Sequence, residues 1–81
     1  MREPIVVPDL GWPNVVLSVW YVKPGEEVYA GDRVVELLLG SATFDIAAPC
    51  AGRLIDRCAG IGEPLTVGQV IGFLEVDEAG Q

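Results

Sequence analysis

The sequence predicts an all-β fold, a flattened barrel or sandwich of about eight short strands in two quasi-symmetric, four-stranded antiparallel sheets. Three observations support this prediction. Short apolar runs rich in strand-forming residues recur along the chain, and glycine or proline interrupts nearly all of them. Residues 34–46 form two such runs joined by the two-residue turn Gly40-Ser41. The sequence also resembles itself after a shift of 37 positions.

The internal repeat superimposes similar residues of the two halves of the chain. The matched pairs are Leu17 with Leu54, Gly25 with Gly62, Glu26 with Glu63, Val28 with Leu65, Gly31 with Gly68, Val34 with Ile71 and Leu37 with Leu74. Each half therefore contains one strand-turn-strand unit that cannot bury its apolar face alone, so we expect the two units to pack together. The central hairpin joins them, which predicts its tip at one end of the molecule and both termini at the other.

The first half of the chain reads as strands separated by glycine and proline turns. Residues 4–8 form a short strand bounded by prolines, which suits the edge of a sheet. Residues 9–14 are a surface loop, and residues 15–22 are a β-branched and aromatic strand without helical periodicity. A Pro-Gly turn at residues 23–26 precedes a very short strand at 27–29.

The central hairpin and the second half follow the same alternation. Gly40 at the first position of a two-residue loop is typical of a type II′ turn, because glycine accepts a positive φ, and Ser41 then lies at the apex in solvent. The later predicted strands are residues 53–58, 65–66 and 70–76. We expect one domain over residues 1–81, with its core at about 4–76 and a frayed polar tail at 77–81.

Composition excludes several functions. The 81 residues are 51% apolar, which is enough for a core and argues against disorder. A net charge of −7 argues against nucleic-acid binding, and it favours either a basic protein partner or a role in solubility. Neither a signal peptide nor an apolar run of membrane-spanning length is visible, so we expect a cytoplasmic protein without membrane contact.

Catalytic and metal-binding residues are not expected. The chain has no histidine, and its carboxylates are scattered beside turns rather than paired as a general acid and base, so an enzyme is not predicted. Two cysteines without histidine cannot fill a tetrahedral metal site, and we expect Cys50 and Cys58 to be buried thiols rather than a disulfide. Tyr29, Phe44 and Phe73 are interpreted as packing residues.

Several stretches resemble the biotinyl/lipoyl attachment family, and within it the lipoyl domains of 2-oxoacid dehydrogenase dihydrolipoamide acyltransferases. The resemblance extends over about residues 5–76 and implies a barrel-sandwich hybrid. The motifs that carry it are Val7-Pro8-Asp9-Leu10-Gly11, Val22-Lys23-Pro24-Gly25-Glu26-Glu27-Val28, Gly31-Asp32, Val35-Glu36-Leu37, Ala42-Thr43-Phe44-Asp45-Ile46-Ala47-Ala48-Pro49, Ala51-Gly52 and residues 62–71.

The resemblance fails at the tip of the hairpin. Lipoyl domains carry Asp-Lys-Ala there and biotinyl domains Met-Lys-Met, whereas this chain has Gly40, Ser41 and Ala42. The modified lysine of the family thus falls on Ser41, and the chain's lysine, Lys23, lies in a different turn. A serine hydroxyl offers at best a hydrolysable ester with little reach, so we expect no lipoyl cofactor.

The loop beside the tip also departs from the family, which often has acidic residues where this chain has Trp12-Pro13-Asn14. We interpret Trp12, Asn14 and Ser41 as a surface that binds a protein partner, either a 2-oxoacid dehydrogenase component or a lipoate-handling enzyme. Trp12 either anchors that interface or folds back over the end of the barrel. Two alternatives stay open: a carrier with unusual attachment at Ser41 or Cys50, and a purely structural assembly module.

Overall fold

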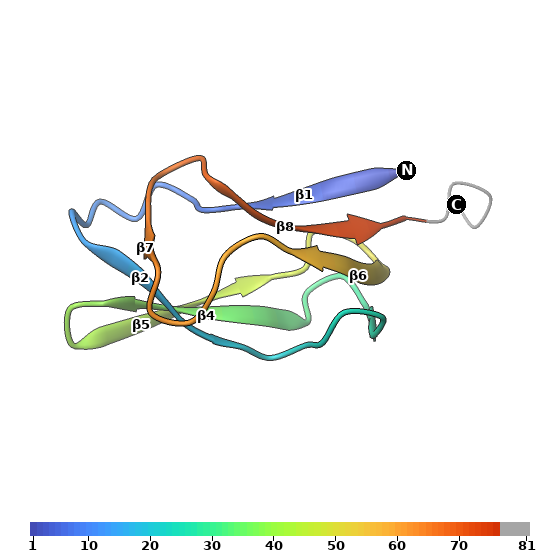
Figure 1. Ribbon diagram of the computed structural model, residues 1–81, viewed down its shortest axis with the longest axis horizontal. Helices are drawn as coiled ribbons and strands as arrows, with labels where there is room; N and C mark the ends of the chain where they lie inside the picture. The colour runs from blue at the N-terminus through green and yellow to red at the C-terminus, as the bar shows by residue number, and fades with distance from the viewer. Residues whose placement is uncertain (77–81) are drawn as a thin grey trace.

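The computed structural model describes residues 1–76, and the predicted frayed tail at 77–81 lies outside them. Within residues 1–76 the regular secondary structure consists of β-strands alone, which confirms the all-β prediction (Figure 1). The strands are β1 (Arg2–Val6), β2 (Val15–Trp20), β3 (Glu27–Val28), β4 (Arg33–Leu39), β5 (Ala42–Ala47), β6 (Gly52–Arg57), β7 (Pro64–Leu65) and β8 (Val70–Glu75).

The strands form two four-stranded antiparallel sheets that are related by the internal repeat. One sheet has the order β1-β8-β6-β3 and the other has the order β5-β4-β2-β7. The shift of 37 positions carries β2 onto β6 and β3 onto β7 with identical bounds, and it carries the first residue of β4, Arg33, onto the first residue of β8, Val70. Each half therefore places its two-residue strand in the sheet of the other half.

The repeat extends to a bulge in each sheet. The register shifts between Leu17 and Val19 in β2 and at the corresponding positions, Leu54 and Asp56, in β6. At the first bulge the Leu17 N–H donates to the carbonyl of Glu63 (3.0 Å), and at the second the Leu54 N–H donates to the carbonyl of the equivalent Glu26 (2.9 Å). These matched bonds tie each central strand to the turn of the other half.

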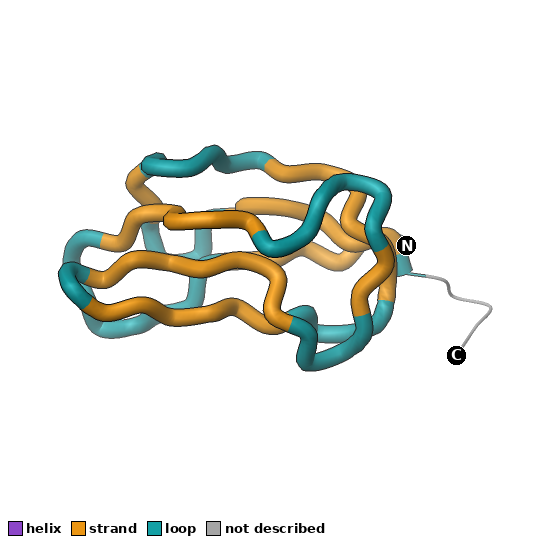
Figure 2. The backbone as a smooth tube through the Cα atoms, turned by 90° about the horizontal axis from the view of Figure 1, so that it is seen from below, coloured by secondary structure: helices purple, strands orange, loops and turns teal. Residues whose placement is uncertain are grey.

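The molecule is elongated, 41 × 21 × 18 Å, with its long strands along the long axis and most loops near the two ends (Figure 2). The β4–β5 tip lies at one end and the N-terminus at the other, as the sequence predicts (Figure 1). Among residues 1–76 no polar or charged residue is buried. The apolar core consists of Ile5, Val7, Val15, Leu17, Val28, Val34, Val35, Leu37, Ile46, Ala48, Leu54, Ala59, Leu65, Ile71 and Leu74.

Some predicted details differ in the structure. β1 begins at Arg2 rather than Pro4, because its pairing with β8 continues as far as Glu75. Both cysteines are free thiols, as predicted, but Cys58 is exposed and Cys50 is only half-buried, so the prediction that both are buried is wrong. The strand alternation that would bury Cys58 does not apply, since β6 ends one residue earlier.

Aromatic packing is also less complete than expected. Tyr29 is 70% exposed, so its interpretation as a packing residue is wrong. It lies just beyond the two-residue strand β3, where no paired strand covers its side chain. Phe44 lies on an edge strand and is 39% exposed. Phe73 is half-buried, with the Arg2 guanidinium carbon 5.4 Å from its ring centroid.

Candidate functional site

The candidate site is the turn that joins β4 to β5. Leu39 pairs with Ala42, which leaves Gly40 and Ser41 as a two-residue loop. Gly40 has a φ of 65°, whereas Ser41 is not in the left-handed region, which is the pattern of the predicted type II′ turn. Gly40, Ser41 and Ala42 are all exposed, and within residues 1–76 the Ser41 hydroxyl makes no hydrogen bond. The turn thus presents its backbone and one short hydroxyl to solvent.

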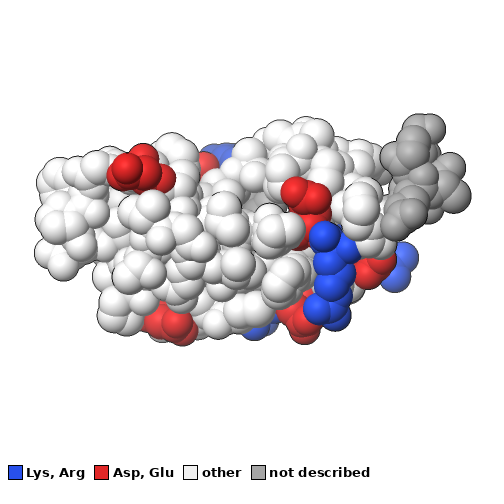
Figure 3. Space-filling model, turned by 90° about the horizontal axis from the view of Figure 1, so that it is seen from above, with Lys and Arg blue, Asp and Glu red and all other residues white. Residues whose placement is uncertain are grey.

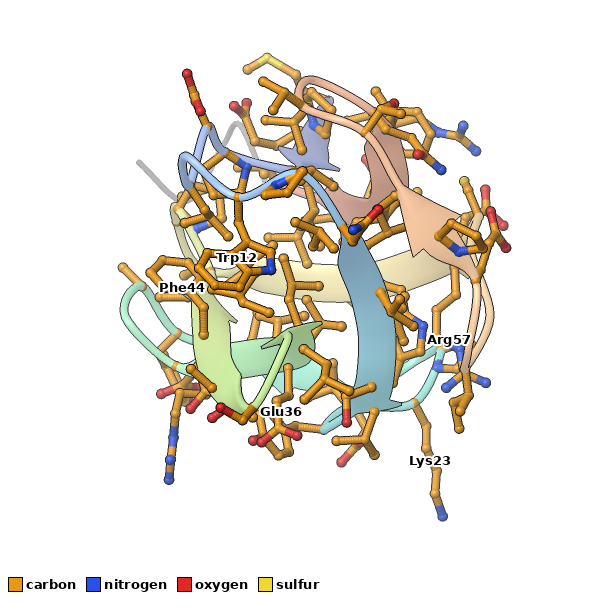
Figure 4. All side chains as sticks on the ribbon, turned by 90° about the vertical axis from the view of Figure 1, so that its left-hand side faces the viewer. Trp12, Lys23, Glu36, Phe44 and Arg57 are labelled. Atoms are coloured by element: carbon orange, nitrogen blue, oxygen red, sulfur yellow. The ribbon has the colours of Figure 1, made fainter. Side chains whose placement is uncertain are left out.

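Trp12 lies directly against this turn. A Cβ atom built on Gly40 would be 3.0 Å from Trp12 Cζ2 and 3.6 Å from Cε2, so the indole packs on the bare Cα of the glycine. The ring is nevertheless 50% exposed. In the end-on view of Figure 4, Trp12 and Phe44 lie in the same part of the picture. Trp12 therefore covers one side of the tip and presents its other face to solvent, which combines the two arrangements considered for it.

The loop before β2 positions both Trp12 and Asn14. Gly11 has a φ of 67°, and its N–H donates to Asp9 Oδ1 (3.0 Å), a local turn that directs the following Trp12 toward the tip. Asn14 is exposed and immediately precedes Val15, whose Cα pairs with that of Leu39 beside the tip. The structure thus brings Trp12, Asn14 and Ser41 to one end of the molecule, although Ser41 lies far from the other two in the sequence.

The hairpin end is nearly uncharged. Across residues 8–16 and 38–44, the charged residue is Asp9. The space-filling view shows the same asymmetry, with a mostly uncharged surface at the hairpin end and basic side chains toward the middle and the other end (Figure 3). In a chain with a net charge of −7, this end therefore presents an apolar and hydrogen-bonding surface rather than an acidic one.

A polar cluster on the outer face of the hairpin was not anticipated from the sequence. Tyr21 Oη lies 3.0 Å from both Glu36 Oε1 and Asp45 Oδ1, so its single hydrogen is shared between two carboxylates. Arg33 completes the cluster, 3.4 Å from Asp45 Oδ2. Desolvation, followed by these hydrogen bonds, raises the pKa of Tyr21 to about 12. The sequence did contain a signal for this pair of carboxylates, because the register set by the two-residue turn places Glu36 opposite Asp45.

The described residues contain no group of three or more His, Cys, Asp or Glu side chains that could hold a metal ion. In the same part of the chain, no helix has the length and apolar character needed to cross a membrane. The side chains that gather at the hairpin end, namely an indole, an amide and a hydroxyl, can make contacts and hydrogen bonds with a partner surface.

Comparison with known families decides the identity of this fold. The biotinyl/lipoyl family, described as "Biotin-requiring enzyme", matches residues 3–74. The chain belongs to this family. The match covers both halves of the repeat and all eight strands except the first residue of β1 and the last of β8.

Curated relatives of this biotinyl/lipoyl domain are acyltransferase components of 2-oxoacid dehydrogenase complexes. The lipoamide acyltransferase component of the branched-chain alpha-keto acid dehydrogenase complex of Pseudomonas aeruginosa is 33% identical over 78 residues, covering 94% of this chain and 18% of the relative. The dihydrolipoyllysine-residue succinyltransferase component of the 2-oxoglutarate dehydrogenase complex of Rickettsia conorii is 31% identical over 80 residues, covering 96% and 20%. The chain thus spans about a fifth of the length of these relatives.

Solved structures show the same biotinyl/lipoyl fold. The lipoyl domain of the 2-oxoglutarate dehydrogenase complex from Azotobacter vinelandii has a TM-score of 0.71 at 20% identity, covering 89% of this chain and 96% of that domain. A single-chain, multi-domain long-chain acyl-CoA carboxylase has a TM-score of 0.75 at 18% identity, covering 98% of this chain and 8% of the carboxylase. These similarities establish the two-sheet architecture.

The biotinyl/lipoyl family carries its cofactor on a lysine, and the residues at this tip do not fit such an attachment. Ser41 presents a hydroxyl and no amine. The lysine of the chain, Lys23, follows the far end of β2, since Val15 at the start of that strand pairs beside the tip and Trp20 at its end pairs with Val35. In the end-on view Lys23 also projects away from Trp12 (Figure 4).

Proposed function

We propose that this biotinyl/lipoyl domain is a non-lipoylated binding module, related to the swinging-arm carriers of 2-oxoacid dehydrogenase complexes, that recognises a protein partner through its hairpin end. The partner class is a 2-oxoacid dehydrogenase component or a lipoate-handling enzyme. This role needs no cofactor and no catalytic residue, and Gly40, Ser41 and Ala42 then act as an unmodified contact surface.

The observation that carries this proposal is the chemistry of the tip. Lipoyl and biotinyl groups are attached through an amide to a lysine amine, which has a long flexible stem. Ser41 has a neutral hydroxyl on one carbon, and an ester formed there would hold an arm close to the turn. Ser41 is exposed, so the absence of an amine rather than burial of the site is what disfavours attachment.

Trp12 supports binding as the remaining role of this end. A half-exposed indole is costly to leave in water, and Trp is enriched among residues that dominate the energetics of protein interfaces. Its contact with Gly40 holds the ring in place, so a partner would not have to immobilise it. Asn14 and Ser41 supply neighbouring hydrogen-bonding groups, which would form the polar rim of such an interface.

The first experiment is the intact mass of the protein purified from its own source, followed by fragmentation of the peptide that contains Ser41. We expect the peptides that contain Ser41 and Cys50 to have their unmodified masses. A lipoyl, pantetheinyl or other group on Ser41 or Cys50 would overturn the proposal and make the domain a carrier.

A second experiment tests the contact surface. We expect purified 2-oxoacid dehydrogenase component or lipoate-handling enzyme from the same organism to bind the domain, and Trp12→Ala to weaken binding by at least about tenfold. Tyr29→Ala is the matched control, because Tyr29 is also an exposed aromatic residue, at 70% against 50% for Trp12. It follows β3, whose partner residues Gly52 and Arg53 lie toward the other end of the molecule. Absence of binding, or equal loss in both variants, would contradict the proposed surface.

A further inference from the structure

The free edge of β5 differs from the other three sheet edges. β3 and β7 are edge strands of only two residues, which are too short to template another strand. β1 is longer, but it carries Pro4 and two charged residues before it. β5 has six residues without proline or lysine, and its register to β4 is regular from Ala42 to Ile46. Apart from the single charge of Asp45, β5 therefore lacks the features that usually protect an edge.

Proline protects β1 because of its orientation. The Val76 N–H donates to the carbonyl of Met1 (2.7 Å), so alternate residues of β1 direct their backbone groups toward β8. Pro4 is out of phase with Met1 and occupies a position that faces outward, where it removes a donor from the free edge. Pro4 thus disfavours the pairing of another strand with the centre of the β1 edge.

The outward backbone groups of β5 follow from the hairpin turn. In a two-residue turn the N–H of Ala42 donates to the carbonyl of Leu39, so Ala42, Phe44 and Ile46 bond toward β4. Antiparallel alternation then directs the N–H and C=O groups of Thr43 and Asp45 away from the sheet. Among residues 1–76, no other backbone hydrogen bond satisfies these four groups.

We propose that β5 pairs antiparallel with β5 of a second copy of this chain, with Phe44 opposite Phe44 on the two-fold axis. This register places each Thr43 opposite Asp45 of the other copy, so their outward N–H and C=O groups form two reciprocal pairs of hydrogen bonds. The geometry of an antiparallel ladder requires that the two residues in such a pair both face outward, and this pair meets the requirement.

Side chains favour this register over its neighbours. Phe44 is 39% exposed, and an aromatic pair on the axis would cover both rings. A register centred on Asp45 would oppose two carboxylates, which is unfavourable. A register centred on Thr43 would place Phe44 opposite Ala42 and lose the aromatic pair. In the proposed register each Asp45 carboxylate instead meets a threonine hydroxyl, and Arg33 at 3.4 Å already offsets its charge.

The experiment introduces a negative or a positive charge at Thr43, which is exposed and can be changed without altering the core. Thr43→Asp would oppose Asp45 twice across the axis, and we expect it to raise the dimer dissociation constant by roughly tenfold. Thr43→Lys would place a lysine opposite Asp45 of the other copy at both symmetry-related positions. We expect this attraction to lower the dimer dissociation constant by a similar factor. Sedimentation equilibrium over a range of protein concentrations measures both.

Matched controls separate the edge from the overall charge. Thr66→Asp and Thr66→Lys make the same charge changes at an exposed residue just after β7, and they should shift the dissociation constant much less. Amide exchange gives a second readout, since the Thr43 and Asp45 N–H groups should slow as concentration rises. Weakening by both Thr43 variants would overturn the register, and no association of the unmodified chain up to about 1 mM would overturn the dimer.

Discussion

The two halves of the repeat have the same backbone structure but carry different residues on their surfaces. At each turn a carboxylate side chain closes the loop: Glu26 Oε1 accepts the Lys23 N–H (2.7 Å), and Glu63 Oε1 accepts the equivalent Gly60 N–H (3.0 Å). Outside the turns and the core, equivalent positions differ. Position 20 is tryptophan and position 57 is arginine, while position 21 is tyrosine and position 58 is cysteine.

This comparison separates residues that make the fold from residues that make the surface. The conserved half-to-half features are the buried leucines at the bulges, the glycines with positive φ and the turn hydrogen bonds. The divergent features are an indole, a phenol and the hairpin tip, which belong to the first half or follow it directly. Function therefore has to be sought where the repeat is broken, and substitutions at equivalent positions can test that division.

The largest expected effect is on the matched core leucines. Leu17 and Leu54 are both fully buried at equivalent bulges. We expect Leu17→Ala and Leu54→Ala each to lower the free energy of unfolding by about 2–5 kcal/mol, because each leaves a cavity in one shared core. Urea denaturation measures both. Values that differ by more than about 2 kcal/mol would show that the halves do not share the core equally.

The matched turn glycines should give a smaller effect. Gly25 and Gly62 have φ values of 95° and 85°, with no atoms within 4 Å of an added Cβ. Alanine at either position should therefore cost about 1–2 kcal/mol through backbone strain alone. Gly60→Ala is the control, since Gly60 also has open space but is not left-handed. Loss of stability in the control equal to that in Gly25→Ala would refute the strain argument.

Trp20 tests a position where the halves differ. Its indole Nε1–H donates to the carbonyl of Ala59 (3.0 Å), and Cη2 lies 3.1 Å from a Cβ built on Gly72. We expect Trp20→Phe to cost about 1 kcal/mol through the lost hydrogen bond and some lost contact area. Arg57→Ala, at the equivalent position, should cost only about 0.5 kcal/mol, because Arg57 is exposed and the contact it loses is the cation–π contact of its guanidinium, 5.8 Å from the Trp20 ring centroid. Equal costs in the same denaturation experiment would mean that the two positions are not distinct.

Alkaline pH tests the Tyr21 cluster, which has no counterpart around Cys58. The pKa of Tyr21 is raised from 10.0 to about 12, so its contribution to stability is present below pH 10 and is lost as pH rises to 12. Phenolate absorbance in a Tyr29→Phe background, where Tyr21 is the remaining tyrosine, measures this pKa. Glu36→Gln should move the pKa back toward 10, because Glu36 accepts one of the two hydrogen bonds. An unchanged pKa in that variant would place the cause elsewhere.

The hairpin tip should have the smallest effect on stability. Ser41 is exposed and not left-handed, so Ser41→Lys should change the free energy of unfolding by less than about 0.5 kcal/mol.

We further expect a lipoate ligase to modify the double variant Gly40→Asp/Ser41→Lys in vitro, as detected by an increase in mass. The aspartate side chain would press against Trp12, because a Cβ atom built on Gly40 lies only 3.0 Å from Trp12 Cζ2. No modification of a folded variant would show that the Trp12 loop, and not the tip alone, differs from what a ligase recognises.

Much of the fold was predictable because it depends on local signals that occur twice. The shift of 37 positions predicted the equivalent strands, and Gly40 predicted the turn, since a two-residue loop needs a positive φ at that point. Strand ends were less predictable, because β1 gains Arg2 and Glu3 only through its distant partner β8. The position of Trp12 on Gly40 is likewise a tertiary contact between a loop and a turn, with no local signal.

The pairing of the first strand with the last has a consequence for how the domain folds during its synthesis. β1 pairs with β8, and Arg2 lies opposite Glu75, so the sheet that starts at one terminus is completed only near the other. A ribosome must therefore release almost the whole domain before the first strand can find its neighbour. Until then the apolar side of β1 stays uncovered, so the domain folds only after nearly all of its residues have been synthesised.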